Sequence, residues 1–123
     1  LPPLAGAILA LEEVNETPHA LDRFLTQLDL SGAVAGLAGL VLGHFTDCRP
    51  RSEPLTVEDG RERVLSWARG LGVPTLLDFP YGHEETCCAL PFGSEGYLTT
   101  DPPSLTVALP FPGAAPGTVP NAR

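Results

Sequence analysis

The sequence contains no methionine and no lysine, and it has only three cysteines among its 123 residues. All seven basic residues are arginines, while 15 residues are acidic, so the formal net charge is −8. A domain this acidic is a poor candidate for binding a phosphate backbone, and no nucleic-acid partner is expected. No apolar run approaches the roughly 20 residues that a membrane-spanning helix needs, so no membrane partner is expected either.

Two further absences concern the start of the chain. The first residue is Leu1 rather than methionine, and no basic segment followed by an apolar one marks a signal peptide. We therefore expect the chain to be an excised piece or a processed product, from which an upstream segment could have been lost.

The three cysteines form no recognisable redox or zinc pattern. Cys87 and Cys88 are adjacent, Cys48 lies far from them, and no Cys-x-x-Cys spacing occurs. In a strand, the two neighbours would point to opposite faces. We expect reduced, partly buried thiols in a cytosolic protein.

What the chain does have is the material for one packed domain. Hydrophobic residues make up 43% of it, which is enough for a core. Apolar runs predict strands at residues 6–12, 38–45 and 74–79, followed by shorter ones at 87–91, 95–99 and 104–109. Parallel crossovers in the first half and a meander in the second predict an α/β domain with a mixed sheet.

Two helices should lie between the first three strands. Thr17 is a predicted N-cap with Pro18 at the first helical position, and Gly32 should end this helix. Residues 56–59 have capping-box spacing and open the second helix, which glycines 70 and 72 should end. Each helix has one apolar face, formed by Leu21, Phe24, Leu25 and Leu28 in the first and by Val64, Leu65, Ala68 and Leu71 in the second. The composition of residues 110–123 predicts a flexible tail.

Two titratable residues stand where apolar, strand-like runs end. Glu12 follows residues 7–11, and His83 lies in a loop just after residues 74–79. Side chains at strand ends are held rigidly and still face a loop surface, which suits catalytic groups. A carboxylate that orients a histidine is two-thirds of a hydrolytic triad. Each residue keeps a plain alternative from local sequence alone, as a surface charge for Glu12 and a solvated loop side chain for His83.

The other candidates are weaker. Glu13 and Glu16 compete with Glu12 as the carboxylate, and His19 should be exposed in a first helical turn. His44 should be a hydrogen-bonded sheet residue rather than a ligand, because no His-x-x-x-His or His-Glu-x-x-His spacing supports a metal site. Neither a metal nor another cofactor is therefore expected.

The sequence shows no nucleophile to complete a triad. No serine lies in the Gly-x-Ser-x-Gly turn that exposes a reactive hydroxyl, and Ser94 in a Gly-Ser-Glu-Gly segment comes closest. Cys87 and Cys88 follow His83 closely, but a Cys–His pair needs side chains that face each other rather than near neighbours in sequence.

With these segments identified, the chain resembles the C-terminal domain of the LD-carboxypeptidase family of serine peptidases. The resemblance covers the chain up to about residue 109, as one domain followed by the tail at 110–123. Six blocks in the right order carry it: 6–16 (GAILALEEVNE), 21–28 (LDRFLTQL), 39–48 (GLVLGHFTDC), 72–74 (GVP), 79–83 (FPYGH) and 90–93 (LPFG).

The resemblance implies a swivelling β/β/α-type domain that supplies Glu12 and His83 to a Ser–His–Glu triad. It implies that the serine belongs to an N-terminal domain outside this chain. The implied substrate is a murein tetrapeptide that loses a terminal D-amino acid during cytoplasmic peptidoglycan recycling. A sister branch of the family hydrolyses microcin C instead. Homodimers are common in the family, so we expect one here.

Two hypotheses from different classes follow. The chain is either the Glu12- and His83-bearing part of a serine carboxypeptidase, inert alone, or a domain that has kept the scaffold and binds a peptide or protein partner without catalysis.

Overall fold

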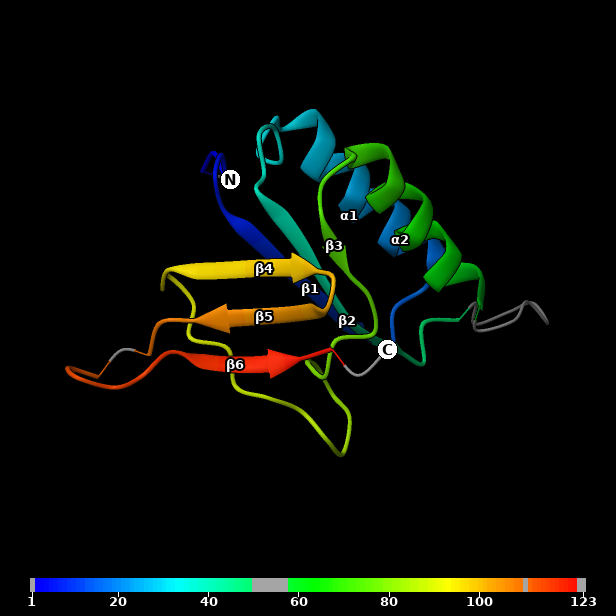
Figure 1. Cartoon of the computed structure of the whole chain (residues 1–123). Helices are drawn as coiled ribbons and strands as arrows, with labels where there is room; N and C mark the ends of the chain where they lie inside the picture. Colours follow the sequence, from blue (N-terminus) through cyan, green and yellow to red (C-terminus); the bar gives the residue numbers. More distant parts are fainter. Residues whose placement is uncertain (1, 50–57, 110, 122–123) are drawn as a thin grey trace.

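The fold consists of two three-stranded sheets and two helices (Figure 1). A computed structural model describes residues 2–49, 58–109 and 111–121. Sheet A is parallel, with the strand order β1-β2-β3, and sheet B is antiparallel, with the order β4-β5-β6. The elements are β1 (Ile8–Val14), α1 (Pro18–Leu30), β2 (Gly39–Thr46), α2 (Glu58–Leu71), β3 (Thr75–Leu76), β4 (Gly96–Thr100), β5 (Pro103–Val107) and β6 (Gly117–Pro120).

The predicted α/β class with two main helices is confirmed, and the arrangement is layered. Both helices cover one face of sheet A, and sheet B covers the other face (Figure 1). This is a β/β/α order of layers. The parallel and antiparallel pairings that we expected within one mixed sheet are divided between the two sheets.

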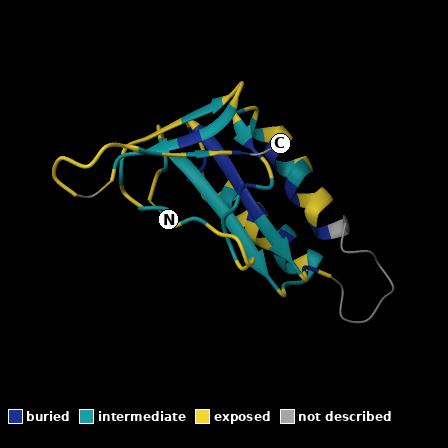
Figure 2. Cartoon of the chain, turned by 60° about the horizontal axis from the view of Figure 1, so that its bottom comes forward, coloured by how far each residue is buried: buried dark blue, intermediate teal, exposed yellow. Residues whose placement is uncertain are grey.

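Strand β2 is the centre of both cores, because its side chains alternate between the two faces of sheet A. Leu40 and Leu42 pack against the helices, in a cluster with Leu21 and Val64. Val41 points the other way, into a cluster with residues that include Leu105 of sheet B. Gly39–Gly43, the first five residues of the strand, are all buried (Figure 2).

The apolar faces predicted for both helices are confirmed, except that Phe24 is 39% exposed. Thr17 caps α1 as predicted, since its Oγ1 accepts a hydrogen bond from the backbone N–H of Ala20 at 3.2 Å. The capping box predicted at residues 56–59 includes Thr56, which lies outside the described residues. Neither of the two helices is long and apolar enough to cross a membrane, in the part of the chain that the structure describes.

The Thr17 cap leads to a stability prediction. Thr17→Ala should lower the free energy of unfolding by about 1 kcal/mol, because it leaves a helix N-terminal N–H without its acceptor. Urea unfolding followed by circular dichroism would measure the change. Thr17→Ser keeps the hydroxyl and should stay within about 0.5 kcal/mol of the parent, so equal losses in both variants would contradict the cap's role.

The structure differs from the predictions in three strands. The third strand pairs regularly only at Thr75–Leu76, and Asp78 then takes a positive φ of 51° that interrupts it. Residues 87–91 form no strand, although Cys88 and Leu90 pack into the core between the sheets. Gly117–Pro120, within the predicted flexible tail, pairs with β5 as an edge strand instead.

Candidate active site

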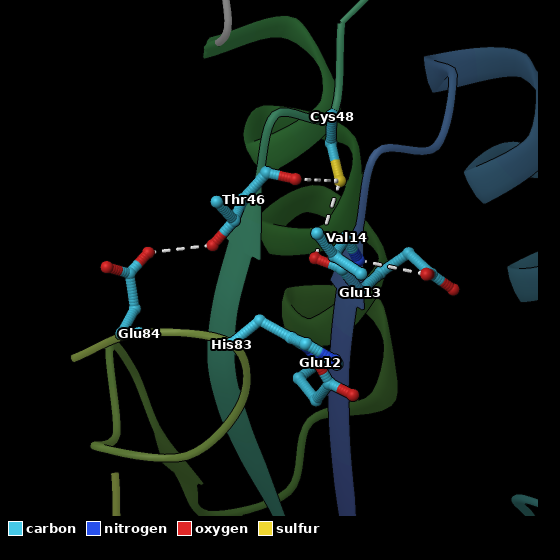
Figure 3. Close-up of polar contacts among 7 residues, drawn as sticks. All are labelled: Glu12, Glu13, Val14, Thr46, Cys48, His83 and Glu84. Carbon is cyan, nitrogen blue, oxygen red and sulfur yellow. Dashed lines mark hydrogen bonds and ion pairs between the residues drawn. The ribbon is translucent and has the colours of Figure 1, made fainter. Parts of the chain in front are cut away.

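Glu12 and His83 are brought together, although they lie 71 residues apart in the sequence. The Nδ1 atom of His83 lies 3.0 Å from Oε2 of Glu12, and the two side chains point toward each other (Figure 3). An ionised carboxylate only accepts hydrogen bonds, so Nδ1 carries the proton and donates it. In the neutral imidazole, the other ring nitrogen, Nε2, then carries no proton and can accept one.

The two side chains differ in exposure. The Glu12 side chain is 23% exposed, whereas that of His83 is 62% exposed. The Glu12 carboxylate is thus mostly buried, and the His83 imidazole lies at the surface. In the residues that the structure describes, the contact with Glu12 is the only hydrogen bond of the His83 ring.

Glu12 owes its orientation to the alternation of β1. Leu9 and Leu11 pack on the helix side of sheet A, while Ile8 and Ala10 face sheet B. By the same alternation, the Glu12 side chain lies on the face of Ile8 and Ala10, toward the loop that carries His83. Opposite it the register shifts, because Leu11 pairs with Leu42 but Glu13 pairs with Phe45. The extra residue in β2 is a bulge, a feature that often re-aims side chains at functional sites.

Two glycines allow the loop with His83 to approach. A Cβ atom at Gly43 of β2 would lie 2.3 Å from the carbonyl oxygen of Tyr81, so only glycine fits there. That carbonyl accepts a hydrogen bond from the backbone N–H of His44 at 3.1 Å. Gly82 has a φ of 119° and lies directly against Glu12, since a Cβ atom added at Gly82 would be 3.1 Å from Oε2 of Glu12. This positive φ is a backbone conformation that glycine adopts readily, and it lets the chain turn sharply just before His83.

Tyr81 also belongs to this region, and the sequence reading did not single it out. Burial raises the pKa of its phenol, and the nearby Glu12 carboxylate adds to the shift. Its ring meets the Phe92 ring edge-on, with 6.3 Å between centroids. The only signal in the sequence was its place in the Phe-Pro-Tyr-Gly-His block.

The other two candidate carboxylates, Glu13 and Glu16, form hydrogen bonds with backbone groups next to them in the sequence. Glu13 accepts a hydrogen bond from the N–H of Val14 at 2.9 Å, and Glu16 accepts one from the N–H of Thr17 at 3.3 Å. Neither is hydrogen-bonded to His83, so Glu12 is the one of these three carboxylates that contacts the histidine ring.

The other two histidines lie apart from the pair. His19 is exposed on α1, as predicted. His44 uses its backbone N–H in the contact with Tyr81, but its ring Nδ1 is buried and has no hydrogen-bond partner among the residues that the structure describes. Among residues 2–49, 58–109 and 111–121, no group of three or more His, Cys, Asp or Glu side chains is placed to hold a metal ion.

No serine or cysteine is hydrogen-bonded to His83 within the described residues. The side chains of Ser31 and Ser104 form hydrogen bonds with residues other than His83. Those of Ser66 and Ser94 form none within the described part of the chain. All three cysteines are free thiols. Burial raises the pKa of Cys48 and of Cys88, which keeps them protonated and unreactive at neutral pH.

A cavity of about 550 Å³ lies between β1, β5 and residues 90–96. Apolar side chains from both sheets line it, among them Ile8, Val41 and Leu105. Ala10, which also lines it, lies two residues before Glu12 on the same face of β1. The cavity therefore shares a face of sheet A with the Glu12–His83 pair.

Comparison with known proteins identifies relatives of this chain. The family model for the LD-carboxypeptidase C-terminal domain matches residues 1–98. The murein tetrapeptide carboxypeptidase of Pseudomonas aeruginosa is 39% identical over 95 residues, covering 76% of this chain and 30% of that protein.

Two solved structures have a similar fold. The muramoyltetrapeptide carboxypeptidase from Oxalobacter formigenes matches 89% of this chain and 35% of its own, with a TM-score of 0.61 and 30% identity. The microcin C7 self-immunity protein matches 89% of this chain and 32% of its own, with a TM-score of 0.69. At 20% identity, the second likeness concerns the fold alone. The chain spans about a third of the length of the curated relatives that it matches.

Proposed function

Because the chain belongs to the LD-carboxypeptidase C-terminal domain family, we propose that it supplies the histidine and glutamate of a serine carboxypeptidase. His83 is the general base and Glu12 is the residue that orients it. The observation that carries this proposal is the 3.0 Å contact between His83 Nδ1 and Glu12 Oε2. In triad peptidases, a carboxylate in this position holds the imidazole in the tautomer whose other nitrogen can accept a proton.

The reaction then follows from the free Nε2 atom. His83 takes the proton from a serine hydroxyl as the serine oxygen attacks the carbonyl carbon of the scissile amide. When the carbon–nitrogen bond breaks, the imidazolium returns that proton to the leaving amine. Glu12 stabilises the imidazolium between these steps. Water, activated by the same nitrogen, hydrolyses the acyl-enzyme and regenerates the serine.

The serine comes from a part of the protein outside this chain. Two observations support this: no described serine is hydrogen-bonded to His83, and the matched part of the chain covers only about a third of each relative's length. The 62% exposure of the His83 side chain leaves room for a second domain to bring a hydroxyl to Nε2. The oxyanion-hole donors are expected beside that serine.

The proposed substrate is a murein tetrapeptide, from which the enzyme removes the terminal D-amino acid. The relatives support this choice, since the Pseudomonas protein is a murein tetrapeptide carboxypeptidase and the Oxalobacter protein a muramoyltetrapeptide carboxypeptidase. We also propose a cytoplasmic homodimer, in keeping with a role in peptidoglycan recycling.

The test compares the chain alone with the full-length protein on a synthetic tetrapeptide ending in D-alanine. Release of D-alanine is measured with a coupled oxidase assay. The full-length protein should release it and the chain alone should not. Activity of the chain alone would contradict the requirement for an external serine.

The same assay separates the alternatives. Hydrolysis of processed microcin C, with the tetrapeptide left intact, would assign the immunity-peptidase activity instead. Binding of the tetrapeptide without hydrolysis of either substrate would favour a non-catalytic peptide-binding domain.

A further inference from the structure

A second side-chain contact holds the loop that carries His83. Thr46, the last residue of β2, donates a hydrogen bond from Oγ1 to Oε1 of Glu84 at 2.7 Å. The two residues are 38 positions apart in the sequence. Glu84 directly follows His83, so this bond and the Glu12 contact restrain consecutive residues of one loop (Figure 3).

The loop has little else to hold it. Residues 83–87 are exposed and have no regular secondary structure. The nearest backbone anchors are the carbonyls of Pro80 and Tyr81, which accept from Cys88 and His44. For residues 82–86, the described part of the chain shows two hydrogen bonds, and both are the side-chain contacts just named.

Thr46, by contrast, is firmly placed. It pairs with Val14 of β1, and its carbonyl accepts a hydrogen bond from the N–H of Asn15 at 2.8 Å. Glu12 lies on the same strand, two residues before Val14. A bond from Glu84 to Thr46 therefore fixes the loop relative to the strand that carries the carboxylate partner of His83.

We infer that Thr46 and Glu84 are positioning residues, whose hydrogen bond keeps His83 within reach of Glu12. The inference rests on the proposed function. A displacement of about 1 Å at a catalytic group can cost around a hundredfold in rate. A second contact that limits the motion of an exposed histidine therefore bears directly on turnover.

The experiment uses the full-length protein with substitutions at both ends of the bond. Thr46→Val and Glu84→Ala each remove it. Thr46→Ser keeps the donor, and Glu84→Gln keeps an acceptor oxygen while it removes the charge. Glu85→Ala is the matched control, because it removes the neighbouring exposed carboxylate, which has no hydrogen bond in the described part of the chain.

We expect kcat for D-alanine release to fall about tenfold in Thr46→Val and in Glu84→Ala, with KM and the melting temperature unchanged. Thr46→Ser, Glu84→Gln and Glu85→Ala should keep kcat within about twofold of the parent. The double variant Thr46→Val/Glu84→Ala should be no slower than either single variant, because both remove the same bond.

A second measurement does not depend on activity. The ¹⁵N chemical shifts of the two ring nitrogens of His83, recorded where the ring is neutral, report which nitrogen is protonated. The parent should show protonated Nδ1, and Thr46→Val should shift the ring toward protonated Nε2.

The outcomes separate the two claims. If the parent releases no D-alanine, the proposed function fails, while the ring shifts still decide whether the bond positions His83. Unchanged kcat in an active enzyme with Thr46→Val would overturn the inference, as would unchanged ring shifts in that variant. A loss in Glu84→Gln as large as in Glu84→Ala would assign the effect to charge and overturn it too.

Discussion

His83→Ala in the full-length protein is expected to lower kcat for tetrapeptide hydrolysis by roughly 10⁴-fold or more. The variant loses the imidazole that we propose takes the proton from an incoming hydroxyl. Because the proposed role of the imidazole is to act on the reacting atoms rather than to bind the substrate, KM should change little. Initial rates of D-alanine release at saturating substrate would measure the effect.

Glu12→Gln should cause a loss of similar size for a different reason. The amide keeps the shape of the side chain, but its NH₂ group can donate to Nδ1 and so favour the tautomer that has no free acceptor at Nε2. Glu13→Gln is the matched control, since Glu13 bonds to the backbone N–H of Val14 and not to His83. A loss below tenfold in both His83→Ala and Glu12→Gln would contradict their assignment.

Gly43→Ala is expected to lower the free energy of unfolding by about 3 kcal/mol or more. The added Cβ would lie 2.3 Å from the carbonyl oxygen of Tyr81 and 3.1 Å from its carbon. Both are backbone atoms, so a side-chain rotation cannot relieve the clash. The segment before His83 would have to move away from β2, and the contact with Glu12 would be lost with it.

Urea unfolding would measure this loss, and Gly70→Ala provides its control. A Cβ at Gly70, near the end of α2, meets nothing within 4 Å. Because alanine favours helix more than glycine does, that variant should be as stable as the parent or up to about 1 kcal/mol more stable. Equal effects at the two glycines would show that the close approach at Gly43 is unimportant.

The helices and the main strands could be predicted from the sequence because their signals are local. Leu21 and Leu25 share one face of α1 by spacing alone, and Thr17 caps that helix with its own hydroxyl. The end of the third strand was harder, because the positive φ of Asp78 interrupts an apolar run that looks continuous. The strand at Gly117–Pro120 was missed because its pairing depends on the free edge of β5, which no local pattern reveals.

The candidate site likewise has features that the sequence could predict and features that depend on the three-dimensional arrangement. Local sequence left Glu12 and His83 each with a plain alternative, and the family resemblance was needed to pair them. The contact between Thr46 and Glu84 could not be foreseen, since neither residue type nor spacing marks a bond across 38 positions. The need for glycine at position 43 likewise depends on where the Tyr81 carbonyl arrives in space.

The two sheets differ in how far along the chain their pairings reach, and this affects the order in which they can form. In sheet B, Tyr97 pairs with Thr106 in a hairpin, whereas Ile8 of sheet A pairs with Gly39 across a whole helix. Closing a longer loop costs more chain entropy, and the contact between Glu12 and His83 spans 71 positions. That contact joins β1 to the loop that follows β3, so we expect the His83 ring to become ordered only after the strands of sheet A have paired.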